Sequence, residues 1–115
     1  MLSHKNRFHG PHSLRTMYRN GQTVHSHVCK VKYLHNPRRN DSRFAIVVSK
    51  KVHKSAVGRN RIRRRFFEVI RAQIPIMKPG MDVVVIVVSG EALALSFEEI
   101  DVTLKQLFHE ANLYE

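Results

Sequence analysis

The strongest restriction on the fold of this chain is an arginine-rich run that passes directly into two phenylalanines. Residues 59–65 read Arg-Asn-Arg-Ile-Arg-Arg-Arg, and Phe66 and Phe67 follow at once. Five guanidinium groups placed so closely repel one another, so such a run is tolerated only in a disordered tail or opposite a polyanion. Because the apolar residues that follow argue against a tail, the run is predicted to start a folded helix that faces a polyanionic partner.

A helix over residues 56–73 is predicted from the spacing of its apolar side chains. One side of this helix collects Ile62, Phe66, Phe67, Val69, Ile70 and Ile74. The other side collects Asn60, Arg61, Arg64, Arg65, Glu68 and Arg71. Arg59 and Arg63 fall on the apolar side, where burial of an unpaired arginine is too costly. The first turns of the helix are therefore expected to extend beyond the core toward the partner.

The charge of the chain also indicates a nucleic-acid partner. The formal net charge is +11, and five of the nine acidic residues lie within residues 96–115, away from the arginine run. The planar guanidinium group of arginine binds phosphate oxygens and stacks on bases. A helix face that contacts only solvent would not need arginines at this density. A lysine cluster lies just upstream of the helix. The predicted nucleic-acid-binding set is Lys50, Lys51, Lys54, Arg59, Asn60, Arg61, Arg63, Arg64 and Arg65, and nothing in it distinguishes RNA from DNA.

One domain is predicted over residues 1–115, because an apolar content of 43% is that of an ordinary globular chain. Residues 1–12 are expected to be a flexible basic arm, and residues 13–20 a short helix that ends at Gly21. A single cysteine excludes an internal disulfide and fits a cytoplasmic location. The N-terminus has no apolar stretch typical of a signal peptide, and no apolar run is long enough to span a bilayer. No membrane partner is expected.

Three strands and a final helix complete the expected order of elements. Residues 24–34 and 43–49 are predicted to pair as a hairpin, and the unbroken apolar run 81–89 to be buried on both faces. Ser96 and Glu99 form a predicted capping box at the start of the last helix. That helix is expected to pack through Phe97, Ile100, Leu104, Leu107, Phe108 and Ala111.

Catalytic or metal chemistry by the protein's own side chains is not expected. The three aspartates of the chain fall in a loop, at a strand start and in a helix, so nothing gathers them as a two-metal nuclease requires. His25 and His27 share one face of the predicted strand, but Cys29 is alone and no CxxC or HExxH motif supplies further ligands. Histidines on an RNA-facing surface are the favoured interpretation, and neither a catalytic residue nor a metal ligand is assigned.

Two basic clusters follow a strand in a characteristic order. The sequence reads Val48-Ser49-Lys50-Lys51-Val52, then Lys54, then Ala56-Val57, then Arg59-Asn60-Arg61-Ile62-Arg63-Arg64. This order resembles the protein subunit of bacterial ribonuclease P. The rest of the chain agrees, with Gly80 and Asp82 before an apolar strand and Leu95-Ser96-Phe97 before the last helix. The resemblance covers roughly residues 6–114.

The resemblance implies a fold, an activity and partners. The implied fold is α/β (α+β), a small two-layer sandwich in which helices pack on a mixed sheet of three to four strands. It contains an uncommon left-handed βαβ crossover, as in domain 2 of a small-subunit ribosomal protein. The implied enzyme removes the 5′ leader of precursor tRNA, and its RNA subunit and substrate hold the catalytic Mg²⁺. The protein would then pair 1:1 with that RNA, contact the leader, bind no metal alone and be inactive alone.

The resemblance also implies a cleft for the single-stranded leader between the first helix and the sheet. Tyr18 matches an aromatic residue of that cleft, and aromatic or apolar residues on the following strand could stack on bases. The family often carries an aromatic residue where this chain has Leu14 and Lys32, and an arginine where it has Phe67. The predicted leader cleft consists of Leu14, Tyr18, Val31, Lys32 and Tyr33.

Two alternatives stay open at this point. A ribosomal-type structural RNA-binding protein would also be small, basic and α/β. A protein-only nuclease would cleave RNA without an RNA subunit. The combination of Lys50-Lys51 with Arg59-Asn60-Arg61 favours the ribonuclease P protein over both.

Overall fold

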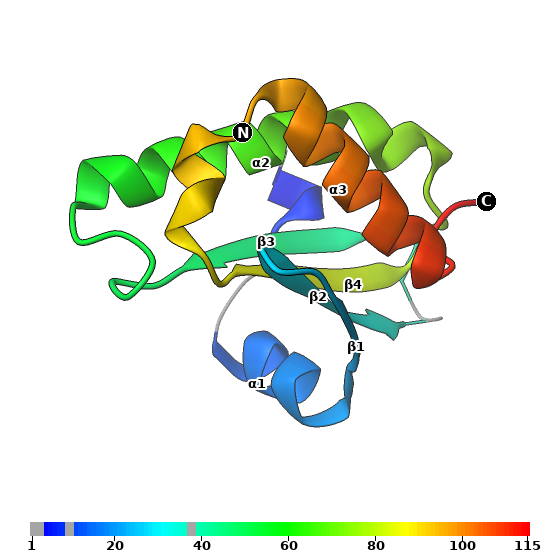
Figure 1. The fold of residues 1–115 in the computed structure, drawn as a ribbon. Coiled ribbons are helices and arrows are strands. Elements are labelled where there is room, and N and C mark those ends of the chain that lie inside the picture. The colour runs from blue at the N-terminus through cyan, green and yellow to red at the C-terminus, as the bar shows by residue number, and fades with distance from the viewer. Residues whose placement is uncertain (1–3, 9–10, 37–38) are drawn as a thin grey trace.

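The computed structural model describes residues 4–8, 11–36 and 39–115, with the side chains of His4 and of residues 11–14 excepted. Its elements are η1 (His4–Asn6), α1 (Pro11–Asn20), β1 (Gln22–His25), β2 (Cys29–His35), β3 (Arg43–Val48), α2 (Ala56–Gln73), η2 (Ile74–Ile76), β4 (Met81–Val87), η3 (Gly90–Ala94) and α3 (Phe97–Glu110). Figure 1 shows α2 and α3 on one face of the sheet and α1 on the other. This α+β arrangement of helices on a mixed sheet confirms the predicted fold class.

The four strands form one mixed sheet in the order β1-β2-β4-β3. β4 pairs antiparallel with β2 and parallel with β3, so that β3, α2 and β4 form a parallel βαβ unit. Six of the seven residues of β4 are buried. This confirms burial on both faces, which an unbroken run of valine and isoleucine predicts.

The predicted hairpin between residues 24–34 and residues 43–49 is wrong, because β4 lies between these two segments. Strands that follow one another in sequence usually pair. Here, however, β4 can bury both faces of its apolar run only in the middle of the sheet. β2 and β3 therefore lie on opposite sides of β4.

The strand predicted over residues 24–34 is in fact two strands. The chain turns at Ser26, whose Oγ accepts hydrogen bonds from the backbone N–H groups two and three residues further on, both at 3.3 Å. β1 then pairs with β2 so that Val24 lies opposite Val31, and both contribute to the core. One continuous strand would instead have placed Val24 on the face of Lys32.

The N-terminal segment packs beside β3 over residues 4–8, in contrast to the flexible arm expected there. Asn6 is buried and donates from Nδ2 to the carbonyl oxygen of Ser42 at 2.8 Å. Arg7 forms a parallel bridge with Phe44 of β3. These contacts extend the sheet at its edge, and the other residues of the expected arm that precede residue 11 lie outside the described residues.

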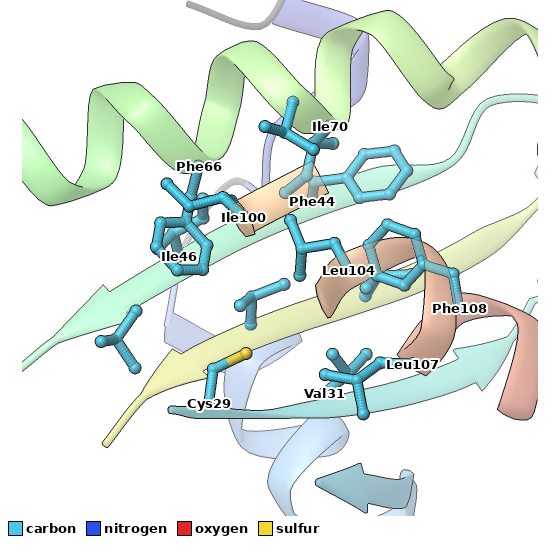
Figure 2. Close-up of a cluster of buried hydrophobic side chains, with 14 of the residues drawn as sticks. Cys29, Val31, Phe44, Ile46, Phe66, Ile70, Ile100, Leu104, Leu107 and Phe108 are labelled. Carbon is cyan, nitrogen blue, oxygen red and sulfur yellow. The ribbon is translucent and has the colours of Figure 1, made fainter. Parts of the chain in front are cut away.

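The hydrophobic core lies between the sheet and the helices α2 and α3. Figure 2 labels its principal side chains, which are Cys29, Val31, Phe44, Ile46, Phe66, Ile70, Ile100, Leu104, Leu107 and Phe108. Ile62, Phe66, Val69 and Ile70 of the predicted apolar side of α2 are fully buried. Phe67 and Ile74 are only partly buried at the margin of the core. The amphipathic pattern of α2 is thereby confirmed.

The start of α3 is defined by its capping box, as predicted. Ser96 Oγ accepts a hydrogen bond from the backbone N–H of Glu99 at 3.1 Å, and Glu99 Oε1 accepts one from the backbone N–H of Ser96 at 3.0 Å. The apolar face of α3 begins only at Ile100, because Phe97 at the first helical position is 49% exposed. The expectation that Phe97 packs in the core is therefore wrong.

Candidate nucleic-acid interface

The start of α2 is held by contacts around His53. Ser55 is the N-cap of α2, and its Oγ accepts a hydrogen bond from the backbone N–H of Gly58 at 3.0 Å. The backbone N–H of Ser55 donates to Nδ1 of His53 at 3.1 Å, and a Cβ atom at Gly58 would stand only 2.2 Å from the His53 ring. Arg59 donates from Nη1 to the carbonyl oxygens of His53 at 3.0 Å and Lys54 at 2.9 Å. The basic loop and the first turn of α2 are thus fixed together and present their charges as one surface.

Arg65 also binds the protein's own backbone, which its position on the polar side of α2 did not predict. It donates from Nη1 to the carbonyl oxygen of Leu93 at 2.6 Å and from Nη2 to that of Leu95. Its guanidinium group therefore holds α2 against the segment between β4 and α3. Every residue carries a backbone carbonyl group, so the types and spacing of residues along the chain could not have revealed this contact.

The other cationic side chains in and just before the first turns of α2 have no acidic partner among the residues that the structure describes. Lys50, Lys51, Lys54, Arg61 and Arg64 are exposed, and Arg63 is half-buried. Within the described part of the chain, no ion pair involves these residues or Arg59 and Arg65. An uncompensated group of cations this dense attracts a polyanion and releases counterions when it binds one.

A second basic surface lies on the face of the sheet that α1 partly covers (Figure 1). Tyr18 of α1 is 44% exposed, and Nζ of Lys32 lies 6.0 Å from the centre of its ring. Lys30 projects to the same face as Lys32, because alternate residues of a strand share a face. Tyr18 and Lys32 of the predicted leader cleft are therefore neighbours. Leu14 belongs to α1, but its side chain lies outside the described residues.

Val31 and Tyr33, the two other predicted cleft residues, do not lie on this surface. Val31 is fully buried in the core, on the opposite face of β2 from Lys32. Tyr33 packs against the same core and donates from its hydroxyl to Oε1 of Gln22 at 3.0 Å. The period of two along a strand separates these residues from the lysines. The structure thus removes Val31 and Tyr33 from the predicted cleft.

Two apolar residues complete the second surface and were missed from the sequence. In the sheet register, Lys30 lies opposite Ile86 of β4, and Ile86 lies opposite Val47 of β3. Ile86 and Val47 are both half-buried. They come beside Lys30 only because β4 lies between β2 and β3, and the predicted hairpin had excluded that order.

The aspartates are paired with cations and the cysteine is buried. The aspartates form ion pairs within the protein, which are Asp41 with Lys5 at 3.9 Å, Asp82 with Arg43 at 2.7 Å and Asp101 with Lys105 at 2.9 Å. Burial raises the pKa of the Cys29 thiol to about 11, against a smaller opposite effect of its hydrogen bond with Ser26. The thiol is therefore protonated at neutral pH and unreactive.

The histidines are dispersed over the described residues. His25 ends β1, whereas His27 lies in the turn that follows, so the two do not share a strand face as predicted. Nε2 of His27 lies 3.7 Å from the Glu91 carboxylate at an exposed position. Among residues 4–8, 11–36 and 39–115, no group of three or more histidine, cysteine, aspartate or glutamate side chains could hold a metal ion.

The fold and these two surfaces define a class of protein. On one face of a small mixed sheet lies a helix whose first turns carry cations without acidic partners among the described residues. The other face of the sheet carries lysines beside an exposed aromatic ring. Phosphate-binding cations next to stacking surfaces are typical of proteins that bind single-stranded nucleic acid. In the part of the chain that the structure describes, no helix is long and apolar enough to cross a membrane. The chain is therefore a small α+β nucleic-acid-binding protein.

Comparison with known proteins identifies the family. The family model for ribonuclease P matches residues 2–112. A ribonuclease P protein component from Synechocystis is 35% identical over 101 residues, which cover 88% of this chain and 81% of that protein. One from Rippkaea orientalis is 32% identical and covers 94% of this chain and 87% of that protein. The chain therefore belongs to the ribonuclease P protein family, so that RNA binding and a place in an RNA-processing enzyme follow from its membership.

Solved structures agree with the fold. The ribonuclease P protein of Staphylococcus aureus superposes with a TM-score of 0.84 at 24% identity, over 96% of this chain and 98% of that protein. The Thermotoga maritima protein gives a TM-score of 0.80 at 22% identity, over 90% of this chain and 96% of that protein. The ribosomal-type alternative is set aside by the family match, which spans nearly the whole chain.

Proposed function

We propose that this protein pairs 1:1 with ribonuclease P RNA in the cytoplasm and assists removal of the 5′ leader from precursor tRNA. The observation that carries this proposal is the group of cations at the start of α2, which have no acidic partner among the described residues. The positive charge of this group is not neutralised until phosphates lie across from it. The RNA subunit supplies those phosphates.

The leader is assigned to the second surface. Tyr18 offers an exposed ring, and Lys30 and Lys32 offer charge beside it. Ile86 and Val47 add apolar contact area on the same face. A single strand can lie here with its bases on the aromatic and apolar groups and its phosphates near the lysines.

The protein itself contributes binding and orientation, and the RNA subunit carries out the hydrolysis. The described residues contain no cluster of three or more metal ligands, so the residues present do not fit a protein-borne catalytic metal site. The catalytic Mg²⁺ is assigned to the RNA subunit and the substrate. Neutralisation of phosphates where RNA subunit and leader converge then raises affinity for the substrate.

Reconstitution tests the proposal. The purified protein is mixed with a bacterial ribonuclease P RNA and precursor tRNA at low Mg²⁺ concentration. We expect cleavage at the mature 5′ end only when protein and RNA are both present. Cleavage by the protein alone would establish a protein-only nuclease, and RNA binding without rescue of cleavage would indicate a structural role.

A further inference from the structure

An apolar hollow interrupts the arginine cluster on α2. It is lined by Val57, Asn60, Arg63, Arg64 and Phe67 and has a volume of about 730 Å³. This volume falls within the range of roughly 300–1,000 Å³ that is typical of ligand sites. A smaller hollow of about 290 Å³ shares Arg64 and Phe67 with it. Phe67 therefore borders both hollows.

Helix geometry explains why these side chains meet. Residues three and four apart lie on one face of an α-helix, and helical side chains lean toward its N-terminus. The Phe67 ring therefore extends over Arg63 and Arg64, whose aliphatic stems continue the apolar wall. Arg63 donates from Nη2 to Oδ1 of Asn60, which is uncharged, so the positive charge remains at the rim of the hollow.

The Phe67 ring is not needed to pack α2 on the sheet, because Phe66 beside it does so. Phe66 is 1% exposed and belongs to the core, whereas Phe67 is half-buried at the margin of that core. Because packing at the margin of the core already restricts the Phe67 side chain, it loses little conformational freedom when a ligand covers its exposed part. The resemblance leads one to expect a cation at this position, and the chain has an aromatic ring instead.

We propose that Phe67 stacks on an unpaired nucleobase of the bound RNA, with Arg63 and Arg64 on the flanking phosphates. RNA supplies a partner for both kinds of group in the hollow, a flat base for the Phe67 ring and anionic phosphate oxygens for Arg63 and Arg64. An apolar protein segment would desolvate the guanidinium groups without supplying an anion. Glu68 lines only the smaller hollow and forms its ion pair with Arg71 at 2.9 Å, so Arg63 and Arg64 have no acidic partner among the described residues. This inference rests on the proposed binding of RNA by α2.

The chain contains no tryptophan, which permits a direct test. Phe67→Trp introduces a single indole into the hollow, and its fluorescence is titrated with a bacterial ribonuclease P RNA transcript. The matched control is Phe97→Trp, because Phe97 is 49% exposed at the acidic start of α3. Stacking on a base is expected to quench the emission from position 67 on RNA binding and to leave the emission from position 97 unchanged.

A second measurement separates stacking from charge. Phe67→Leu keeps an apolar side chain at the margin of the core but removes the π face. We expect its affinity for the same RNA to fall about 5- to 10-fold, the lower part of the range for one base stacked on an aromatic residue. The slope of log affinity against log salt should stay unchanged, because no phosphate contact is lost. Thermal unfolding of both position-67 variants verifies that they fold.

The outcomes distinguish this inference from the proposed function. Unquenched emission from position 67, or native affinity of Phe67→Leu, overturns the stacking role. In that case steep salt-dependent binding by the native chain would leave its RNA-binding function intact. If the native chain fails to bind the RNA at any salt concentration, the proposed function fails and the stacking role fails with it.

Discussion

Arg61 and Arg65 lie one helical turn apart on α2, yet the structure gives them different tasks. Arg65 donates to the carbonyl oxygens of Leu93 and Leu95, whereas Arg61 is exposed and lies at the smaller of the two α2 hollows. Substitution of each by alanine should therefore separate a contribution to stability from a contribution to RNA binding.

The expected magnitudes follow from these contacts. A hydrogen bond with a charged donor contributes about 1.5–3 kcal/mol, and Arg65 makes two of them from a half-buried position. Arg65→Ala should thus lower the free energy of unfolding by about 2–3 kcal/mol, with the lower estimate favoured because solvent screens part of the interaction. Arg61→Ala should change it by less than about 0.5 kcal/mol, as is usual for a surface substitution.

Urea unfolding monitored by far-UV circular dichroism measures the stabilities, and titration with ribonuclease P RNA at several salt concentrations measures binding. Arg61→Ala should weaken binding and reduce the salt slope by about 0.7–0.9 if the arginine contacts one phosphate. Arg65→Lys serves as a control, since it keeps the charge but cannot reproduce the two-pronged contact. Equal losses of stability for the two alanine variants would refute the division of roles.

Three further predictions concern other parts of the molecule. Asp82→Ala removes the buried carboxylate that accepts two hydrogen bonds from Arg43 and should cost about 3 kcal/mol by urea unfolding. Glu68→Ala at an exposed pair should cost less than about 1 kcal/mol, and similar losses for the two variants would contradict this. Because burial raises the pKa of Cys29 from 9.0 to about 11, its stabilising contribution is complete below pH 9 and should be lost as the pH rises to 11, by about 2–3 kcal/mol. Cys29→Ala should abolish that part of the pH dependence, and an unchanged alkaline profile would exclude the thiol as its cause. Tyr18→Leu should weaken binding of precursor tRNA to the reconstituted enzyme but not of mature tRNA, which lacks the leader; equal weakening would place Tyr18 outside the leader surface.

The helices were predictable because their signals are local. The apolar spacing along α2 and the reciprocal contacts of Ser96 and Glu99 each involve residues within one or two helical turns. The bounds predicted for α2, residues 56–73, are those observed. A periodic pattern of this length leaves little choice of secondary structure. The same locality made the cationic character of the helix start readable from the sequence.

The strands were less predictable because their partners are distant. The turn at Ser26 depends on one side-chain oxygen that bonds two backbone N–H groups, and no glycine or proline marks it in the sequence. The central place of β4 depends on how apolar each of the four strands is, because only a strand in the middle of the sheet is covered on both faces. Because the predicted order of strands misplaced β4, Ile86 and Val47 were omitted from the second surface.

The helix that carries the arginines and the polyanionic nature of the partner were readable from the chain alone, and the basic segment carried the resemblance that implied the family and its fold class. These properties reside in charge, in helical periodicity and in one contiguous basic segment. Which basic side chains are available to a partner, and which residues share the second surface with Lys30 and Lys32, depended on the packing of the whole chain. Arg65 is bound to backbone carbonyls 28 and 30 residues away, and Val31 points into the core while Lys32 beside it does not. Hydrogen-bond acceptors of the backbone are the same for every residue type, and strand neighbours are set by global packing, so neither is encoded in the local pattern.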